Sequence, residues 1–420
     1  MKQKIINEIN QRAKPIHNQQ DLDVLLEAIG DSPIVLLGEA THGTSEFYKW
    51  RAEITKRLIL EKGFTSIVVE GDWPACYEIN RYIKGKAHQQ TDTASLLAET
   101  FHYFPSWVLG NEEMVPLIDW LKEYNQGQSE ENQINFYGND VKSLWECMEE
   151  VIRSLERSGS QELLEMARNV YACFESSDRN PQLYGLNAMF FNLSCADGVA
   201  ELYRSLEENR TQKENRTEDD LNDEINALTM LHSEEYFRAM ATEGPHNWNS
   251  RCYHMVDVID RIRAHYGEKN KVIVWGHNTH LGDARATEGM PLEGLINEGQ
   301  ILREQKGYDQ VYAIGFATYS GSVIATTAWG EPLEEMEVPP AHAGGWDALL
   351  HDAGAQDKLF IFNREEPIFS EALPQRAIGV VYQPEKVEYQ TYVVTRLSER
   401  YNALIYIDRT CAVKPLLPGK

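Results

Sequence analysis

Short apolar runs recur along the chain, and each one ends in a small or polar residue before a helical pattern begins. Four of these runs are Ile34–Gly38, Thr65–Val69, Asn135–Gly138 and Val272–Gly276. Continuous apolar runs between helices are typical of strands that are covered on both faces of a sheet. The pattern therefore predicts an α/β fold with a central parallel or mixed sheet flanked by helices.

Later apolar runs extend the predicted sheet, and some of them are close enough in sequence to form hairpins. They are Gln310–Ala317, Ser322–Thr327, Lys358–Asn363, Ala377–Tyr382 and Ala403–Asp408. We expect these strands to make the sheet mixed rather than purely parallel.

Between residues 143 and 268 the pattern becomes helical, without strands in between. The expected helices cover Leu144–Leu155, Glu162–Phe174, Ala188–Leu206 and Leu221–Glu235. The highly charged stretch Glu207–Asp223 is expected to be an exposed loop. We therefore predict one catalytic domain, residues 1–420, that carries a helical insertion subdomain at 143–268.

The charge balance limits the possible partners. Forty Lys and Arg residues face 65 Asp and Glu residues, which gives a formal net charge of −25. A field of this sign repels nucleic-acid phosphates and anionic lipid, so neither is expected as a partner. It weakly favours a neutral or cationic small-molecule substrate.

Cysteine usage and the N-terminus both predict a cytoplasmic protein. The six cysteines form no CxxC pair, so we expect all of them to be reduced thiols. The N-terminus lacks the apolar core of a signal peptide. No uninterrupted apolar stretch approaches the roughly 20 residues that a membrane helix needs.

Ionisable residues follow the predicted strands directly. They are Glu39, His42, Glu70, Asp72, Asp140, His277 and His280. In open α/β sheets the loops at the carboxyl ends of the strands form the ligand site. We therefore expect these carboxylates and imidazoles to lie at one edge of the sheet.

His42 is the preferred general base, because it lies in a loop between Gly38 and Gly43 directly after a strand. Arg51 lies one to two turns into the next helix, and helical side chains lean toward the N-terminus. It can therefore reach back toward Glu39, either as a structural ion pair or to stabilise an oxyanion. No GxSxG, GxGxxG or GxxxxGK[ST] motif is present. Attack by a water that His42 activates is therefore the economical mechanism.

Simpler structural roles compete at several of these positions. Glu70 is suited to acid–base work or to orienting an imidazole, and its structural alternative is an ion pair with Arg51. Asp72 and Asp140 are also suited to cap the helices that follow them. Two other functions also remain open. Glu39, His42, Glu70, His277 and His280 form a credible set of metal ligands, although no compact metal motif occurs and no cofactor is expected. A non-enzymatic protein that binds haem or another small ligand would use His42 or His277.

Several motifs, in this order, resemble the erythromycin esterase family. The matching segments are Gly38–Phe47 with Arg51, Glu70–Trp73, Phe104–Trp107, Phe136–Asp140, Trp248–Met255, His277–Arg285 and Arg376–Tyr382. The resemblance spans nearly the whole chain. Relatives labelled as succinoglycan biosynthesis proteins belong to the same broad family.

The resemblance implies a bacterial hydrolase of a cyclic ester, in the manner of a macrolide esterase linked to antibiotic resistance. Carried over by motif, the His that activates water is His42 and the acidic residue before it is Glu39. The helix arginine is Arg51 and the later histidine is His277, with Glu70 also in the catalytic group. Trp107, Asp72, Asp140 and His280 are then expected to contact the substrate.

Overall fold

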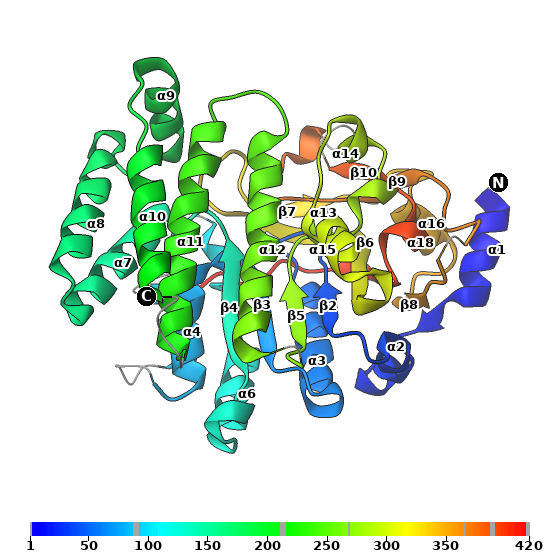
Figure 1. Cartoon of the computed structure of the whole chain (residues 1–420). Coiled ribbons are helices and arrows are strands. Elements are labelled where there is room, and N and C mark those ends of the chain that lie inside the picture. Colours follow the sequence, from blue (N-terminus) through cyan, green and yellow to red (C-terminus); the bar gives the residue numbers. More distant parts are fainter. Residues whose placement is uncertain are drawn as a thin grey trace. The chain divides into compact units, whose positions relative to one another are not determined.

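The structure is a computed structural model whose chain divides into two compact units. The first unit comprises Met1–Ile67, Ile79–Asn135 and Lys271–Lys420, and the second comprises Val68–Glu78 and Phe136–Asn270. The residues described are 2–86, 92–103, 105–210, 216–267, 269–364, 366–386 and 391–416. Figure 1 labels most of the helices and strands that they form.

The first unit is built on a mixed sheet whose strand order is β1-β8-β11-β6-β2-β5, with β7 paired to β6. Strand β2 is parallel to both of its neighbours, β5 and β6, whereas β8 and β7 are antiparallel to β11 and β6. The bounds are β1 Lys14–Pro15, β2 Ile34–Leu37, β5 Val272–Trp275, β6 Val311–Ala325, β7 Glu334–Val338, β8 Lys358–Ile361 and β11 Ala403–Thr410. The predicted α/β class with a mixed sheet is confirmed.

Every residue of β2 and β5 is buried, as their continuous apolar sequence predicts. Helix α3 (Ser45–Lys62) follows β2 and buries Phe47, Ile54 and Leu58 on one side. The Trp275 indole donates a hydrogen bond to Thr55 at 3.0 Å, which ties α3 to the end of β5 (Figure 1).

The other helices of the first unit are mostly short. They are α1 (Lys2–Arg12), α2 (Asp23–Ile29), α5 (Thr93–Thr100), α6 (Val115–Gln126), α13 (Asn278–Leu281), α14 (Gly289–Leu292), α15 (Glu298–Lys306), α16 (Trp346–Asp352) and α18 (Leu397–Arg400). Helices α1 and α16 share a hydrophobic cluster with β8 and β11, in which Ile9, Trp346, Phe360 and Leu404 are buried.

Two strand predictions in the C-terminal part were wrong. The runs Gln310–Ala317 and Ser322–Thr327 form one continuous strand, β6, because Gly321 at φ 154° lets β6 pass close to β11. The run Ala377–Tyr382 is irregular with isolated bridges, and the strand there is β9 (Leu373–Arg376), paired to β10 (Tyr392–Thr395). Of this run only Ile378 and Tyr382 are buried, in a small hydrophobic cluster with β6 and β7.

The second unit contains most of β3 (Ser66–Asp72) and β4 (Asn135–Asp140), followed by a helical region. Its helices are α7 (Leu144–Ser158), α8 (Gln161–Cys173), α9 (Pro181–Phe191), α10 (Ala196–Arg210), α11 (Glu218–Ala239) and α12 (His246–Tyr266). Helix α4 (Trp73–Ile83) follows β3. No described helix of the chain is long and apolar enough to span a bilayer.

Three predictions for the helical region were wrong in detail. The single helix expected at Ala188–Leu206 is two helices, because Asn192 adopts a left-handed conformation that ends α9. Cys173 and Cys195 form a disulfide across the α9 hairpin, so not all six cysteines are thiols as predicted. The loop predicted at Glu207–Asp223 is largely helical in α10 and α11, and its residues 211–215 lie outside the described part.

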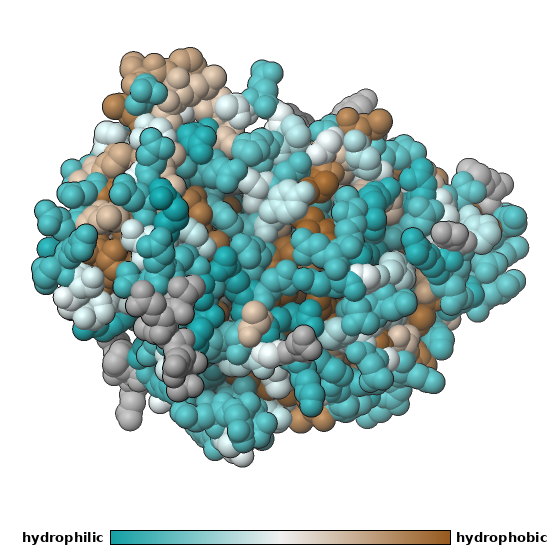
Figure 2. All heavy atoms as spheres, viewed as in Figure 1, coloured by the Kyte–Doolittle hydropathy of each residue, from teal (hydrophilic) through white to brown (hydrophobic). Residues whose placement is uncertain are grey.

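Helix α9 exposes large apolar side chains. Phe190 and Phe191 are 66% and 70% exposed, and Leu186 and Met189 are about half exposed. Figure 2 shows the resulting apolar surface at the upper left, over α9. The inner side of α9 packs against α11, where Gly185 lies against the Phe237 carbonyl.

Substituting Gly321 with Ala is expected to destabilise the protein by about 2 kcal/mol or more. An added Cβ would lie 1.9 Å from the backbone oxygen of Thr410, at a φ that favours glycine. Thermal unfolding measures the loss. Gly289→Ala is the matched control, because nothing lies within 4 Å of a Cβ there; equal melting temperatures for the two variants would contradict the account.

Candidate active site

The Glu39 and His42 side chains form a buried pair just beyond β2. Glu39 is 2% exposed and His42 is 8% exposed. His42 Nδ1 lies 2.8 Å from Glu39 Oε1. Because a carboxylate only accepts hydrogen bonds, this contact puts a proton on Nδ1, so the basic lone pair of a neutral ring is on Nε2.

Arg51 binds the other oxygen of the same carboxylate. Its Nη2 lies 2.6 Å from Glu39 Oε2, and its guanidinium lies between the rings of Tyr48 and Trp275, 4.5 Å from each centroid. Burial by itself raises the pKa of Glu39, but the Arg51 charge and the His42 hydrogen bond outweigh it, so the pKa lies below its usual value. Glu39 is therefore an anion, and Arg51 binds the oxygen that His42 does not contact.

The backbone of the His42 loop is held on both sides. Tyr48 donates its hydroxyl to the His42 carbonyl at 2.8 Å. Gly43 accepts hydrogen bonds from the Ile324 and Val413 amides, and a Cβ at Gly43 would lie 2.0 Å from the Ile324 oxygen. A glycine is therefore required at this position for the loop to approach β6.

His277, at the end of β5, faces His42. The two ring centroids are 4.9 Å apart, and the planes are inclined by 41°. His277 Nδ1 lies 2.7 Å from the Thr279 hydroxyl, and as the N-cap of α13 it accepts the backbone N–H of Thr279 at 3.2 Å. A neutral His277 ring therefore carries its proton on Nε2, which is the opposite tautomer from His42.

His280 and Trp107 are buried in the first unit. His280 lies within α13 at 3% exposure, and its amide bonds to the His277 carbonyl. Trp107 is 1% exposed in a short turn of helix, Ser106–Val108, that begins after Phe104, a residue outside the described part. Their contact with substrate stays a prediction.

In the second unit, Glu70 and Asp140 share one arginine. Arg251 of α12 binds both Asp140 oxygens at 2.8 Å and Glu70 Oε1 at 2.8 Å. Arg251 thus joins the ends of β3 and β4, and it is the functional candidate to which the sequence reasoning gave no role. Its place in the motif Trp248–Met255 was the only available signal.

Two carboxyl groups of this second cluster have pKa values shifted in opposite directions. Burial raises the pKa of Asp140, but the charges of Arg251 and Lys142 hold it well below its usual range. Burial, together with repulsion from Asp140 and Glu146, raises the pKa of Asp72 to about 7. Asp140 does not cap the next helix as considered above, because Ser143 occupies the N-cap position of α7.

A pair of histidines packs next to the second cluster. His232 Nδ1 and His254 Nδ1 are 3.0 Å apart, and His254 is completely buried one helical turn after Arg251. Burial holds the pKa of His254 well below its usual value. The sequence gave no signal for this pairing, because the two residues lie on different helices.

Four of the predicted catalytic residues, Glu39, His42, Arg51 and His277, meet in the first unit, and Glu70 meets Asp140 in the second. Within the described ranges, no group of three His, Cys, Asp or Glu side chains is placed to hold a metal ion.

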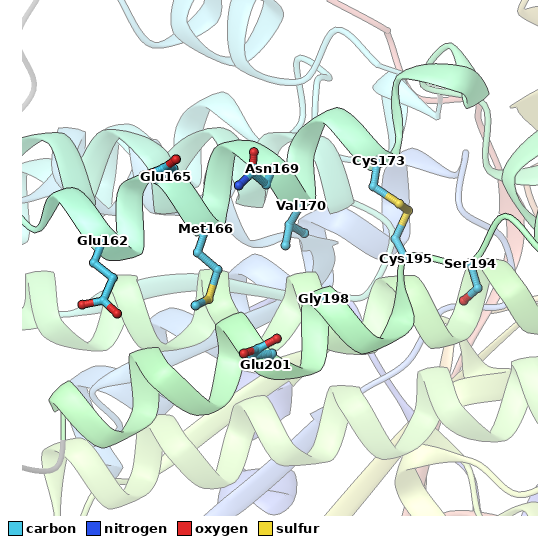
Figure 3. Close-up of a pocket in the computed structure, with 10 residues that line it drawn as sticks. All are labelled: Glu162, Glu165, Met166, Asn169, Val170, Cys173, Ser194, Cys195, Gly198 and Glu201. Carbon is cyan, nitrogen blue, oxygen red and sulfur yellow. A yellow bond between two sulfur atoms is a disulfide. The ribbon is translucent and has the colours of Figure 1, made fainter.

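An open pocket of about 450 Å³ lies between α8 and α10 of the second unit. Figure 3 shows Met166 and Val170 facing Gly198 and Glu201, with the Cys173–Cys195 disulfide at one end. None of the predicted catalytic residues lines this pocket.

The family is decided by sequence comparison. The sequence model of the erythromycin esterase family matches residues 59–410. This chain belongs to the erythromycin esterase family. The match begins after Glu39, His42 and Arg51, so their assignment depends on the motif and on the geometry described above.

Individual relatives agree with the family membership. The chain is 23% identical, over 400 residues, to an erythromycin esterase type II from Escherichia coli, covering 86% of this chain and 87% of that protein. A crystal structure of a succinoglycan biosynthesis protein matches with a TM-score of 0.78 at 20% identity, over 99% and 98% of the two chains. An erythromycin esterase mutant in an open conformation matches with a TM-score of 0.71 at 16% identity, over 97% and 99%. These two structures establish the shared fold.

The stability of Asp72→Asn relative to the wild type should increase as the pH rises from about 4 to about 7. Over this window the folded state keeps a proton on Asp72 that an unfolded chain releases near pH 4. The wild-type Asp72 therefore makes folding less favourable with rising pH, and the amide abolishes this dependence. Melting temperatures at successive pH values measure the effect.

The exposed Asp31 provides the control for that experiment, as Asp31→Asn. A difference between Asp72→Asn and the wild type that stays constant from pH 4 to pH 7, like that of the control, would contradict a raised Asp72 pKa.

Proposed function

We propose that this family member hydrolyses a carboxylic ester with a water molecule that His42 activates, without a covalent intermediate. The observation that carries the proposal is the 2.8 Å contact between Glu39 Oε1 and His42 Nδ1. It fixes the ring in the tautomer whose Nε2 accepts a proton, in the manner of a carboxylate–histidine dyad.

The proton movements follow from the two histidine tautomers. His42 Nε2 takes a proton from water as the water oxygen bonds to the ester carbonyl carbon. The resulting imidazolium is stabilised by the Glu39 anion, and it returns the proton to the alkoxide when the C–O bond to the leaving group breaks. One water is consumed, and an acid and an alcohol are released.

His277 is better suited than Arg51 to stabilise the oxyanion. Its Nε2–H belongs to a ring centred 4.9 Å from the His42 ring, which places a donor beside the base. Arg51 is instead engaged with Glu39 Oε2 at 2.6 Å, so we assign it to orient and neutralise that carboxylate.

The substrate is proposed from the relatives and the charge. The curated relative is named an erythromycin esterase, so macrolide lactones are the first substrates to test. A net charge of −25 favours esters that are neutral or cationic over anionic ones. A cytoplasmic location and a bacterial source remain predictions from the sequence.

His42→Ala is expected to lower kcat for lactone hydrolysis by about 10³-fold or more, because the general base is lost. The assay is a panel of macrolides, simple lactones and activated esters, with circular dichroism to check folding. His17→Ala, an exposed histidine in the same unit, is the control. Equal turnover by wild type and His42→Ala would reject the proposal.

Glu39→Gln is expected to reduce kcat by about 10²- to 10⁴-fold while changing KM little, because the amide no longer fixes the His42 tautomer. The same variant leaves Arg51 buried without its anion, so the melting temperature should fall as well. Steady-state kinetics below the new melting temperature separate the two effects. A change confined to KM would contradict the assigned role.

A further inference from the structure

The loop that carries His277 is fastened to the sheet by its neighbour, Asn278. The Asn278 side chain donates to the Phe316 carbonyl at 2.7 Å and accepts the Phe316 amide at 3.3 Å. The backbone amide of Asn278 donates to the Glu39 carbonyl at 2.8 Å. One residue therefore joins the end of β5 to β6 and to the segment that carries the catalytic carboxylate.

Gly38 leaves room for the Asn278 side chain. Strand β2 pairs with β6 up to Leu37 opposite Ile314, and Gly38 follows. A Cβ at Gly38 would lie 2.2 Å from Asn278 Oδ1. The amide group thus occupies the place where the β2–β6 pairing ends, and Gly38 is required for it.

Arg400 of α18 holds the same loop from the other side. Its Nη2 donates to the Asn278 carbonyl at 3.0 Å, and its Nη1 donates to Thr395 Oγ1 at 2.7 Å and to Gln375 Oε1 at 3.3 Å. Arg400 is 1% exposed, and these three acceptors are all neutral. A Cβ at Gly282 would lie 2.6 Å from Arg400 Nε, so the loop also has a glycine where the guanidinium passes.

We propose that Asn278 and Arg400 are positioning residues, which hold the His277 ring at a fixed distance and orientation from His42. The proposal rests on the proposed function for its kinetic consequence. Burying a guanidinium whose three hydrogen-bond acceptors are neutral is costly, and one of these three hydrogen bonds fixes the loop that carries His277. Misplacement of a catalytic group by about 1 Å can cost about 10²-fold in rate.

The kinetic test uses Asn278→Ala and Arg400→Lys on the full chain. We expect kcat to fall by about 100-fold in the first and about 10-fold in the second, with KM within about twofold of wild type. Arg376→Lys is the matched control, because Arg376 is equally buried and binds the Tyr319 and Pro339 carbonyls instead. Its kcat should stay within about twofold.

A second readout does not depend on esterase activity. Nitrogen NMR of histidine-labelled protein reports which ring nitrogen of His277 is protonated. We expect a single Nε2–H tautomer in the wild type and in Arg376→Lys, and a mixture of tautomers in Asn278→Ala and Arg400→Lys. This result would support positioning even if no ester is hydrolysed by the wild type.

The proposal is overturned if Asn278→Ala and Arg400→Lys, folded at the assay temperature, keep the wild-type kcat or the single His277 tautomer. It is also overturned if Arg376→Lys loses kcat and the single tautomer to the same extent as they do. A lower melting temperature alone, with unchanged kinetics and tautomer, assigns the two residues to stability only.

Discussion

The buried Glu39 carboxylate, divided between Arg51 and His42, is the interaction on which the first unit's site depends. An isolated ionised carboxylate at 2% exposure is strongly disfavoured. Arg51 at 2.6 Å supplies the compensating charge, and two aromatic rings hold its guanidinium in place. The other carboxylate oxygen, Oε1, then binds His42 Nδ1, so the same carboxylate both pairs with Arg51 and orients the base.

The second unit repeats this solution with different residues. Arg251 compensates Asp140 with two hydrogen bonds and Glu70 with one. Each cluster lies where a strand ends and a loop or helix begins. At this position the rigid strand fixes the backbone, while the side chains extend beyond the end of the strand. In both clusters, an arginine from a helix stabilises carboxylates that lie at or just after the end of a strand.

The sequence was sufficient to predict the fold class and the His42 loop. Buried parallel strands have a continuous apolar pattern, and the residues directly after them were identifiable as candidates. Patterns within one segment could not predict contacts between distant segments, such as Arg251 with Glu70 or Cys173 with Cys195. Two strands were predicted where the single strand β6 runs through Gly321, whose lack of a side chain permits the close approach to β11.

The tautomer of His42 tests the central claim most directly. Nitrogen NMR of histidine-labelled wild type and Glu39→Gln distinguishes a protonated Nδ1 from a protonated Nε2. The account predicts a neutral His42 ring with its proton on Nδ1 in the wild type, and loss of this single state in Glu39→Gln. A wild-type ring protonated on Nε2, or a tautomer that Glu39→Gln leaves unchanged, would contradict it.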